Sequence, residues 1–223
     1  MNRTLEEKLK LPTVKVSIGC GMHWKTPFDE WINVDGIANE HTDIVCEFGS
    51  IPLPDECADY LECGDTIEHI VKWRKDEILK EWFRILKIGG TVHIGTPNFH
   101  RAMTEYTVHT IFGKSMPSGW VKLHATDSQG NQYETDYHIM AADTQSPLES
   151  ARQKIYAWQT TPYEQHYDLY TFETLTETLQ QYGFGEIDFS DSPPQELKDP
   201  RNAWWFVVTA KKIKHIGKGD VVK

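Results

Sequence analysis

Two glycines and an aspartate near the amino terminus have the chemistry of a nucleoside-binding site. Gly19 and Gly21 directly follow a β-rich run, and Asp35 ends the next one. A glycine at such a turn lets the backbone approach a ligand closely, because a side chain would fill that space. A carboxylate at the end of the neighbouring strand can accept hydrogen bonds from both hydroxyls of a ribose. The pattern therefore favours an adenosine ligand.

Phosphate-binding motifs are incomplete in this sequence. A dinucleotide fingerprint would place a third glycine three residues after Gly21, where the chain has Trp24. Residues 113–115, Gly-Lys-Ser, resemble the end of a P-loop, but the required upstream glycine position is Val108. A further acidic residue, Glu47, follows the third β-rich run. These positions together predict a pocket for an adenosine without phosphates.

Three further candidates, Asp65, Glu68 and His69, follow a β-rich run at spacing i, i+3 and i+4. On a helical turn they would share one face. A hydroxyl nucleophile must lose its proton, and a histidine with an ordinary pKa of about 6.5 is a natural base. Two alternatives stay open. The triplet is structural, or it binds magnesium, because it resembles the acidic, acidic, histidine set of magnesium-dependent quinone O-methyltransferases and of a small-RNA 2'-O-methyltransferase, and carboxylate oxygens suit such an ion. A magnesium ion would need a fourth ligand, which the sequence does not select among four histidines: His93, His124, His138 and His166.

The elements that would position these residues follow from the hydrophobic pattern. Five β-rich runs precede residue 98, at residues 14–18, 31–35, 43–48, 58–63 and 91–96. Residues 72–87 have the apolar spacing of an amphipathic helix, which Gly89 and Gly90 would end in a left-handed C-cap. Thr171 can cap a last helix running to about Tyr182, before two final strands at 186–189 and 204–210. Strand, helix and strand in this order imply parallel pairing through right-handed crossovers.

The segment 98–170 is far longer than the roughly 2 to 6 residues usual for such a connection. It therefore predicts an insertion with structure of its own. Its aromatic residues could bind an acceptor as a lid or pack the insertion's own core; they are Trp120, Tyr133, Tyr137, Tyr156, Trp158, Tyr163, Tyr167 and Tyr170.

Length and composition limit the class of protein. A chain of 223 residues fits one domain, 1–223, with the insertion 98–170 as an acceptor-binding lid. A net charge of -10 repels phosphate backbones and disfavours a nucleic-acid partner. The one basic cluster comprises Lys211, Lys212, Lys214 and Lys218. A solubilising end explains it about as well as a ligand-binding role, and no function is assigned to it.

Cysteine usage and hydropathy bear on the compartment. The four cysteines, Cys20, Cys46, Cys57 and Cys63, form no CxxC pair and fit reduced thiols in a cytosolic protein. No apolar run is long enough for a signal sequence or a membrane span. The sequence predicts a soluble, cytoplasmic protein without a membrane partner and leaves its oligomeric state open.

The runs VSIGCG, WINVD, DIVCEFGSIPLPDECADYLECGDTIEHI and ILKEWFRILKIGGTVHIGTPN, in unbroken order over residues 14–98, resemble the class I S-adenosylmethionine (SAM)-dependent methyltransferases. The resemblance is closest to a small bacterial and phage branch, of the methyltransferase type 11 kind, often linked to surface-polysaccharide genes. It implies a doubly wound, Rossmann-like α/β fold with a seven-stranded sheet whose last strand is antiparallel.

The resemblance also implies a role for each candidate position. Gly19, Cys20 and Gly21 would border the methionine part of SAM, and Asp35 would hold the ribose. Glu47 and Phe48 would flank the adenine. Cys63 and Gly64 would pass beneath the sulfonium. Asp65, Glu68 and His69 are the catalytic candidates, and no metal ligand is assigned.

The function that this resemblance favours is methyl transfer from SAM to a hydroxyl of a small polar acceptor, such as a sugar or glycan precursor. One alternative is a metal-assisted O-methyltransferase, with magnesium, acting on an aromatic or nucleic-acid hydroxyl. Another is a catalytically silent SAM-fold module that binds a partner. The second alternative stays open because only residues 22–30 separate the first two strands, and Pro27 interrupts them.

Overall fold

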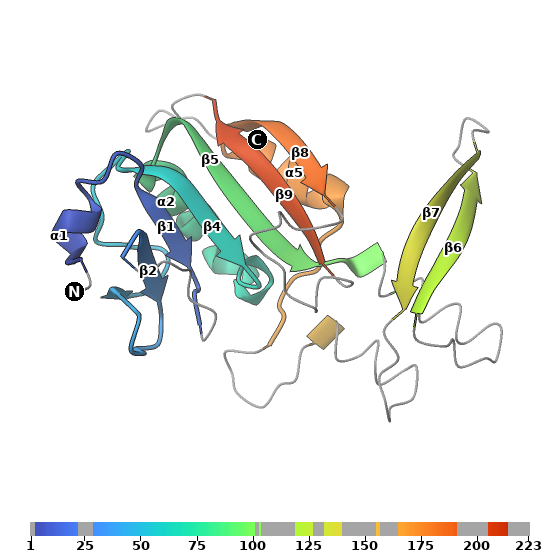
Figure 1. Ribbon diagram of the computed structural model, residues 1–223, viewed down its shortest axis with the longest axis horizontal. Helices are drawn as coiled ribbons and strands as arrows, with labels where there is room; N and C mark the ends of the chain where they lie inside the picture. Colours follow the sequence, from blue (N-terminus) through green and yellow to red (C-terminus); the bar gives the residue numbers. More distant parts are fainter. Residues whose placement is uncertain are drawn as a thin grey trace.

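The computed structural model describes residues 3–21, 29–100, 103, 119–126, 132–139, 155–156, 165–190 and 205–213. Within them, seven strands form one sheet: β1 (Lys15–Ile18), β2 (Trp31–Asp35), β3 (Ile44–Val45), β4 (Ala58–Gly64), β5 (Leu86–Pro97), β8 (Phe184–Ser190) and β9 (Trp205–Lys212). Their order is β3-β2-β1-β4-β5-β9-β8 (Figure 1). The first five strands are parallel, and β9 is antiparallel to both of its neighbours. The expected doubly wound sheet with an antiparallel last strand is confirmed.

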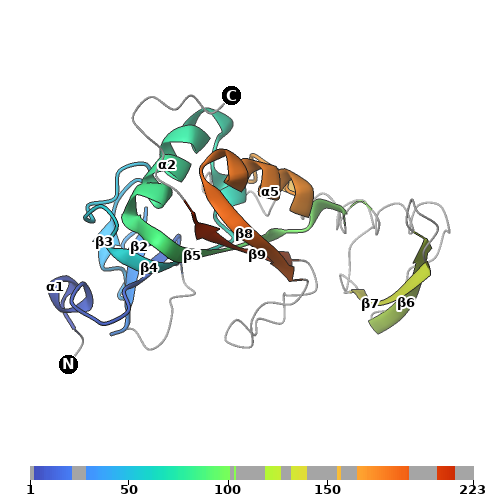
Figure 2. The same cartoon turned by 90° about the horizontal axis from the view of Figure 1, so that it is seen from above.

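Two helices pack on the same face of this sheet, as Figure 2 shows. They are α2 (Lys75–Ile85) and α5 (Phe172–Gln181). Aromatic rings join both helices to β8, because Phe83 lies edge-on to Phe184 and Phe172 lies 4.9 Å from Phe189. Trp82 of α2 is 1% exposed, and burying such a side chain stabilises the fold by roughly 1.5 to 3 kcal/mol.

The end of α2 differs from the sequence prediction. The helix follows a 3₁₀ turn, η2 (Lys72–Arg74), and ends at Ile85. Gly89 does adopt a left-handed backbone with φ +80°, but it lies inside β5 and does not cap the helix. The register there shifts from Leu86 opposite Ala58 to Thr91 opposite Tyr60. Gly89 and Gly90 therefore lie at this register shift within β5.

A lysine from the last strand caps α2 in place of a glycine. The ammonium group of Lys212, 2% exposed, donates hydrogen bonds to the carbonyls of Phe83 and Leu86 at 2.9 and 2.8 Å. It also forms an ion pair with Glu56 at 3.0 Å. The interpretation of this lysine as part of a solubilising end was wrong, because carbonyls left over at a helix end need donors. Lys211 is exposed, and residues 214–223 lie outside the described part of the chain.

The last helix forms as its sequence predicts. Thr171 and Thr174 exchange hydrogen bonds between side chain and backbone in a capping box. The chain leaves the helix at Tyr182 and turns at Gly183, whose φ is +85°. At the other end of the chain, α1 (Leu5–Lys8) also begins with a capping box, formed by Thr4 and Glu7.

The segment 98–170 leaves and re-enters the fold at one point. Asn98 and Tyr170 form an isolated parallel bridge, and the Phe99 N–H donates to the Tyr170 carbonyl at 3.2 Å. The segment contains an antiparallel pair, β6 (Gly119–Thr126) and β7 (Gln132–Ile139), which lies apart from the main sheet in both ribbon views (Figures 1 and 2). The side chains of this pair, and Pro27 in the short first crossover, lie outside what the structure describes.

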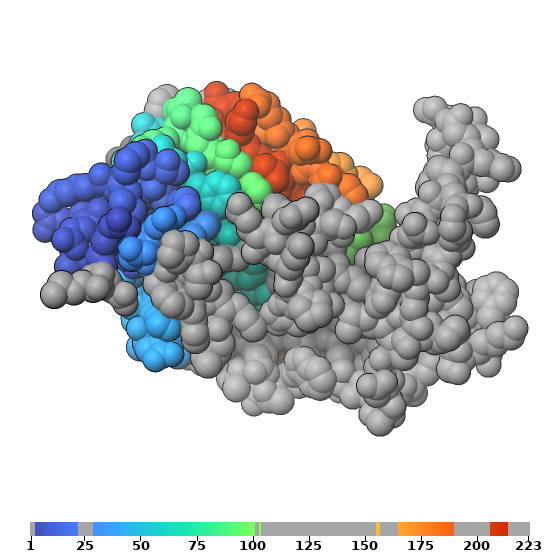
Figure 3. Space-filling view, in the orientation of Figure 1, coloured from blue at the N-terminus to red at the C-terminus, as the bar shows by residue number. Residues whose placement is uncertain are grey.

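The remaining described elements form a continuous body from α1 to β8 (Figure 3). All four cysteines are free thiols. Among the described residues, no helix combines the length and apolarity needed to cross a membrane.

Candidate functional site

The turn after β1 and the end of β2 are held together by Asp35. Its Oδ2 atom accepts the Gly21 N–H at 2.7 Å, and its Oδ1 atom accepts the Ile37 N–H at 2.9 Å. The Asn39 side-chain amide donates to the Gly21 carbonyl at 2.9 Å. A carboxylate oxygen has two lone-pair directions, so Asp35 retains acceptor capacity for a further donor. The structure thus brings Gly21 and Asp35 together, as the sequence predicted.

The two glycines of this turn have different surroundings. Both have positive φ, +68° for Gly19 and +49° for Gly21. A Cβ atom added at Gly19 would lie 2.1 Å from Oγ1 of Thr66, whereas one at Gly21 would meet nothing within 4 Å in the described part of the chain. The interpretation of Gly19 as making room for a ligand needs correction, because the space beside it holds Thr66. Of these two glycines, only Gly21 has an open side among the residues that the structure describes.

Cys20 and Cys63 present their thiols to the protein interior. Burial, with a smaller effect of the Asp35 charge, raises the pKa of Cys20 to about 11. Cys63 is fully buried in the hydrophobic core, and burial raises the pKa of its thiol well above the usual range. Any contact of these two positions with a ligand would therefore come from their backbone.

The predicted adenine positions lie at the surface after β3. The Glu47 carboxylate is 77% exposed and pairs with Arg74 at 2.5 Å. Phe48 is half-buried against the core. Ile37, two residues after Asp35, is 52% exposed and adds an apolar surface that the sequence analysis missed. The only sequence feature that pointed to Ile37 was its position, as an apolar residue two positions after the acidic residue Asp35.

The triplet after β4 does not share one helical face. Asp65 has a left-handed backbone, φ +47°, and the following 3₁₀ turn η1 covers only Ile67–His69. Glu68 is 1% exposed, whereas His69 is half-buried. The expected i, i+3, i+4 face is therefore wrong, because the backbone reverses at Asp65 and a three-residue turn follows.

Glu68 is a buried carboxyl group with one occupied and one open oxygen. Its Oε2 atom accepts the Thr96 hydroxyl at 3.2 Å. Its Oε1 atom is buried and has no hydrogen-bond partner among the described residues. Burial and the charge of the nearby Asp65 carboxylate raise the pKa of Glu68 well above its usual range. Such a group is poised to gain a proton or a cation.

His69 is oriented by the end of the insertion. Its Nδ1 atom lies 3.1 Å from the Gln165 carbonyl oxygen. A carbonyl only accepts hydrogen bonds, so Nδ1 carries a proton, and in the neutral form of this ring Nε2 has the lone pair. The imidazole can therefore accept a proton or ligate a metal through Nε2.

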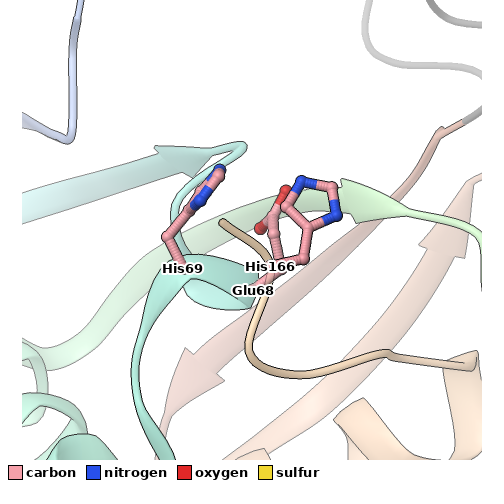
Figure 4. Close-up of side chains that lie close together, drawn as sticks. All are labelled: Glu68, His69 and His166. Atoms are coloured by element: carbon pink, nitrogen blue, oxygen red, sulfur yellow. The ribbon is translucent and has the colours of Figure 1, made fainter. Parts of the chain in front are cut away.

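His166 completes a cluster that the sequence could not select. Its ring lies 4.8 Å from that of His69, at an interplanar angle of 72°. One potential ligand atom from each of Glu68, His69 and His166 lies within 4.8 Å of the others (Figure 4). The N–H groups of Tyr167 and Asp168 donate to the Glu68 carbonyl at 2.8 and 3.2 Å. These backbone bonds bring a residue of distant sequence next to the triplet.

The other candidate histidines are placed elsewhere or not described. His93 lies in β5 with its ring 4.7 Å from that of Tyr60. His124 and His138 belong to β6 and β7, where side chains are not described. Their part in any cluster lies outside the described residues.

Ionic and aromatic contacts fix the segment that carries His166. Lys75 forms an ion pair with Asp168, and its ammonium lies 4.9 Å from the ring centre of Tyr170. Burial, followed by the Asp168 charge, raises the pKa of the Tyr170 hydroxyl far above its usual range. Tyr170 therefore packs as a structural anchor, which was the alternative to acceptor binding for the aromatic residues of the insertion.

Comparison with known proteins gives a family match over part of the chain. A family model described as a methyltransferase domain matches residues 28–94, which include Asp35, Glu47 and Glu68. The comparison with curated proteins gave no match.

Three solved structures are similar to the chain. A 1,6-didemethyltoxoflavin N1-methyltransferase of Burkholderia thailandensis, with bound 1,6-didemethyltoxoflavin and S-adenosylhomocysteine, is 13% identical with a TM-score of 0.51, covering 94% of this chain and 75% of that chain. A SAM-dependent methyltransferase of Mesorhizobium loti is 16% identical with a TM-score of 0.49, covering 90% and 93%. A further one, of Thermotoga maritima and described as a possible histamine N-methyltransferase, is 19% identical with a TM-score of 0.47, covering 89% and 81%.

Proposed function

We propose that the chain is a class I SAM-dependent methyltransferase and that it methylates a hydroxyl of a small polar acceptor such as a sugar or glycan precursor. The observation that carries the choice of a hydroxyl is His69, whose Nδ1 proton is committed to the Gln165 carbonyl. Its Nε2 atom would take the proton that a hydroxyl must lose. The sugar as acceptor is supported by the resemblance of residues 14–98 to a polysaccharide-linked branch.

The residues around Asp35 fit a SAM molecule in the proposed arrangement. Gly21 has an open side for the methionine part, and the Asp35 carboxylate has lone pairs left for ribose hydroxyls. Ile37, Glu47 and Phe48 offer two apolar side chains and an acceptor around an adenine. The proposed contacts with the methionine part and the sulfonium would be made by backbone atoms of Gly19, Cys20, Cys63 and Gly64.

The proposed chemistry asks the protein mainly for alignment. SAM supplies a methyl group on a sulfonium sulfur that leaves as a neutral thioether, so the leaving group needs no acid. The residues after β4 must hold the acceptor oxygen in line with that methyl group and exclude water. His69 would receive the hydroxyl proton, and Asp65 and Glu68 would set the polarity around it.

The insertion 98–170 would form the acceptor site of a single catalytic domain, 1–223. Its two ends meet at Asn98 and Tyr170, beside the end of β5. Its last residues contact the backbone of Glu68. An acceptor held by this segment would therefore lie beside His69.

A variant of His69 tests the proposal. We expect His69→Ala to lower the rate of methyl transfer from SAM to a hydroxyl acceptor by about 100-fold or more, with SAM affinity unchanged. Calorimetry measures the affinity, and transfer of a labelled methyl group measures the rate. His93→Gln is the control, since this histidine of β5 packs against Tyr60 of β4. Full activity of His69→Ala would remove the proposed base.

A further inference from the structure

We propose that Glu68, His69 and His166 bind one divalent transition-metal ion of the zinc, cobalt and manganese class. The three ligand atoms lie within 4.8 Å of one another. Metal bonds of about 2.0 to 2.2 Å would bring tetrahedral ligand atoms to about 3.3 Å apart, so rotations of these side chains would close the site. Figure 4 shows the two imidazoles and the carboxylate gathered around one space.

The donor set selects the kind of ion. Two imidazole nitrogens and one carboxylate oxygen suit zinc and neighbouring transition metals, whereas magnesium prefers oxygen ligands and retains water. The sequence left open a magnesium ion bound by the carboxylates of Asp65 and Glu68. Such an ion fits the cluster less well once His166 adds a second imidazole nitrogen. Three protein ligands also leave a position open for an exogenous oxygen, as in catalytic zinc sites.

The buried oxygen of Glu68 is an independent observation that points to a ligand. Glu68 is 1% exposed, and its Oε1 atom has no hydrogen-bond partner among the described residues. A carboxylate oxygen is costly to bury without a partner. A cation between Glu68 and the two histidines would supply that partner.

Neighbouring groups already orient the ligands as metal sites require. The Gln165 carbonyl lies 3.1 Å from Nδ1 of His69, so Nε2 would be the atom that ligates the ion. The Thr96 hydroxyl donates to Oε2 of Glu68 and holds that carboxylate in place. Such outer contacts fix the tautomer and direction of a ligand before the ion arrives.

The ion would join two parts of the chain. Glu68 and His69 belong to the turn after β4, whereas His166 belongs to the end of the insertion. The segment is already attached there by the bonds from Tyr167 and Asp168 to the Glu68 carbonyl. A bound metal would therefore fasten the acceptor segment to the residues beside the methyl donor.

The role of the ion in methyl transfer rests on the proposed function. The acceptor hydroxyl would bind at the open position, and the charge of the ion would let it lose its proton to solvent near neutral pH. The resulting oxygen forms the new bond to the methyl carbon, while the electron pair of the broken carbon–sulfur bond stays on sulfur. In the metal-loaded protein His69 is a ligand, so the ion replaces the imidazole as the group that promotes deprotonation.

Cobalt titration of the full chain tests the site. Protein dialysed against a chelator is titrated with Co²⁺, and visible absorption reports its coordination. We expect one Co²⁺ per chain, unaffected by millimolar Mg²⁺. Losing an outer contact of a metal site costs 10- to 100-fold in affinity, so losing a ligand in His166→Ala or Glu68→Gln should cost at least about 100-fold. His93→Gln and Glu62→Gln, a histidine and a buried glutamate on β5 and β4, should bind Co²⁺ like the parent.

Thermal melting and SAM binding verify that each variant is folded, and His166→Gln, which retains a polar side chain, replaces an unfolded His166→Ala. Absence of Co²⁺ absorption at millimolar metal, or unchanged titrations in both ligand variants, would overturn the site. Methyl transfer that survives the chelator would then leave the proposed function intact. Specific Co²⁺ binding by a chain that methylates no hydroxyl acceptor would remove the proposed function and retain the site.

Discussion

Asp35 joins the ends of β1 and β2 through hydrogen bonds to the backbone of Gly21 and Ile37. Asp35→Ala should weaken SAM binding by about 1.5 to 3 kcal/mol, the scale for losing hydrogen bonds to a charged group. Calorimetry measures the affinity. The control is Asp55→Ala, because Asp55 pairs with Arg84 and is 77% exposed. An unchanged affinity in Asp35→Ala would exclude this carboxylate from the cofactor site.

The two glycines of the first turn should respond differently to alanine. Gly19→Ala combines a positive φ with a clash against Thr66 and should lower the free energy of unfolding by about 2 kcal/mol or more. Gly21→Ala has open space and should cost about 1 kcal/mol, from backbone strain alone. Urea denaturation measures both.

A second substitution separates the effect of the clash with Thr66 from the effect of backbone strain. Thr66→Ala removes Oγ1 and Cγ2, the two atoms nearest to the added Cβ, so it should restore part of the stability lost in Gly19→Ala. The effects of the two substitutions should therefore be non-additive. Equal losses for Gly19→Ala and Gly21→Ala, with no rescue, would contradict the contact.

At the scale of elements, the end of α2 depends on a side chain from the last strand. Lys212→Met should lower the free energy of unfolding by about 2 to 4 kcal/mol, because the carbonyls of Phe83 and Leu86 lose a charged donor. Lys211→Met is the matched control, since this neighbour pairs with the exposed Glu186 and should change stability by no more than about 0.5 kcal/mol. Chemical denaturation distinguishes them, and equal losses would argue against the cap.

At the scale of the whole molecule, the paired ends of the insertion make it separable from the sheet. Replacing residues 101–164 with a glycine linker keeps the Asn98–Tyr170 bridge and the contacts of Tyr167 and Asp168 with Glu68. Cofactor binding should survive, because Asp35 and Gly21 lie elsewhere on the sheet. Methyl transfer should be lost, because the acceptor is no longer aligned or shielded from water.

Calorimetry with S-adenosylhomocysteine measures cofactor binding by the trimmed protein. A methyl-transfer assay measures its activity. The full-length His93→Gln protein provides the reference for an altered chain with intact activity. A trimmed protein that methylates its acceptor at the parental rate would place acceptor binding outside the insertion.

The order of elements followed from the sequence because it depends on local patterns. The β-rich runs, the apolar spacing around Trp82 and the cap at Thr171 each reflect neighbouring residues along the chain. Parallel pairing then brings the ends of consecutive strands to one edge, so the nearness of Gly21 and Asp35 was also predictable. The end of α2 was not, because Lys212, far away in sequence, supplies the donors that a local glycine cap would otherwise supply.

The composition of the cluster after β4 depended on tertiary structure. The sequence alone does not distinguish the burial of Asp65, Glu68 and His69. In the structure the backbone is left-handed at Asp65, Glu68 is buried and His69 is half-buried. His166 joins them because the chain returns from the insertion and its backbone bonds to the Glu68 carbonyl. Sequence spacing carries no information about such a return, since the path of the insertion sets the distance between its ends. Local periodicity therefore determined the sheet and the edge where Gly21 meets Asp35, and long-range packing determined which groups meet beside Glu68.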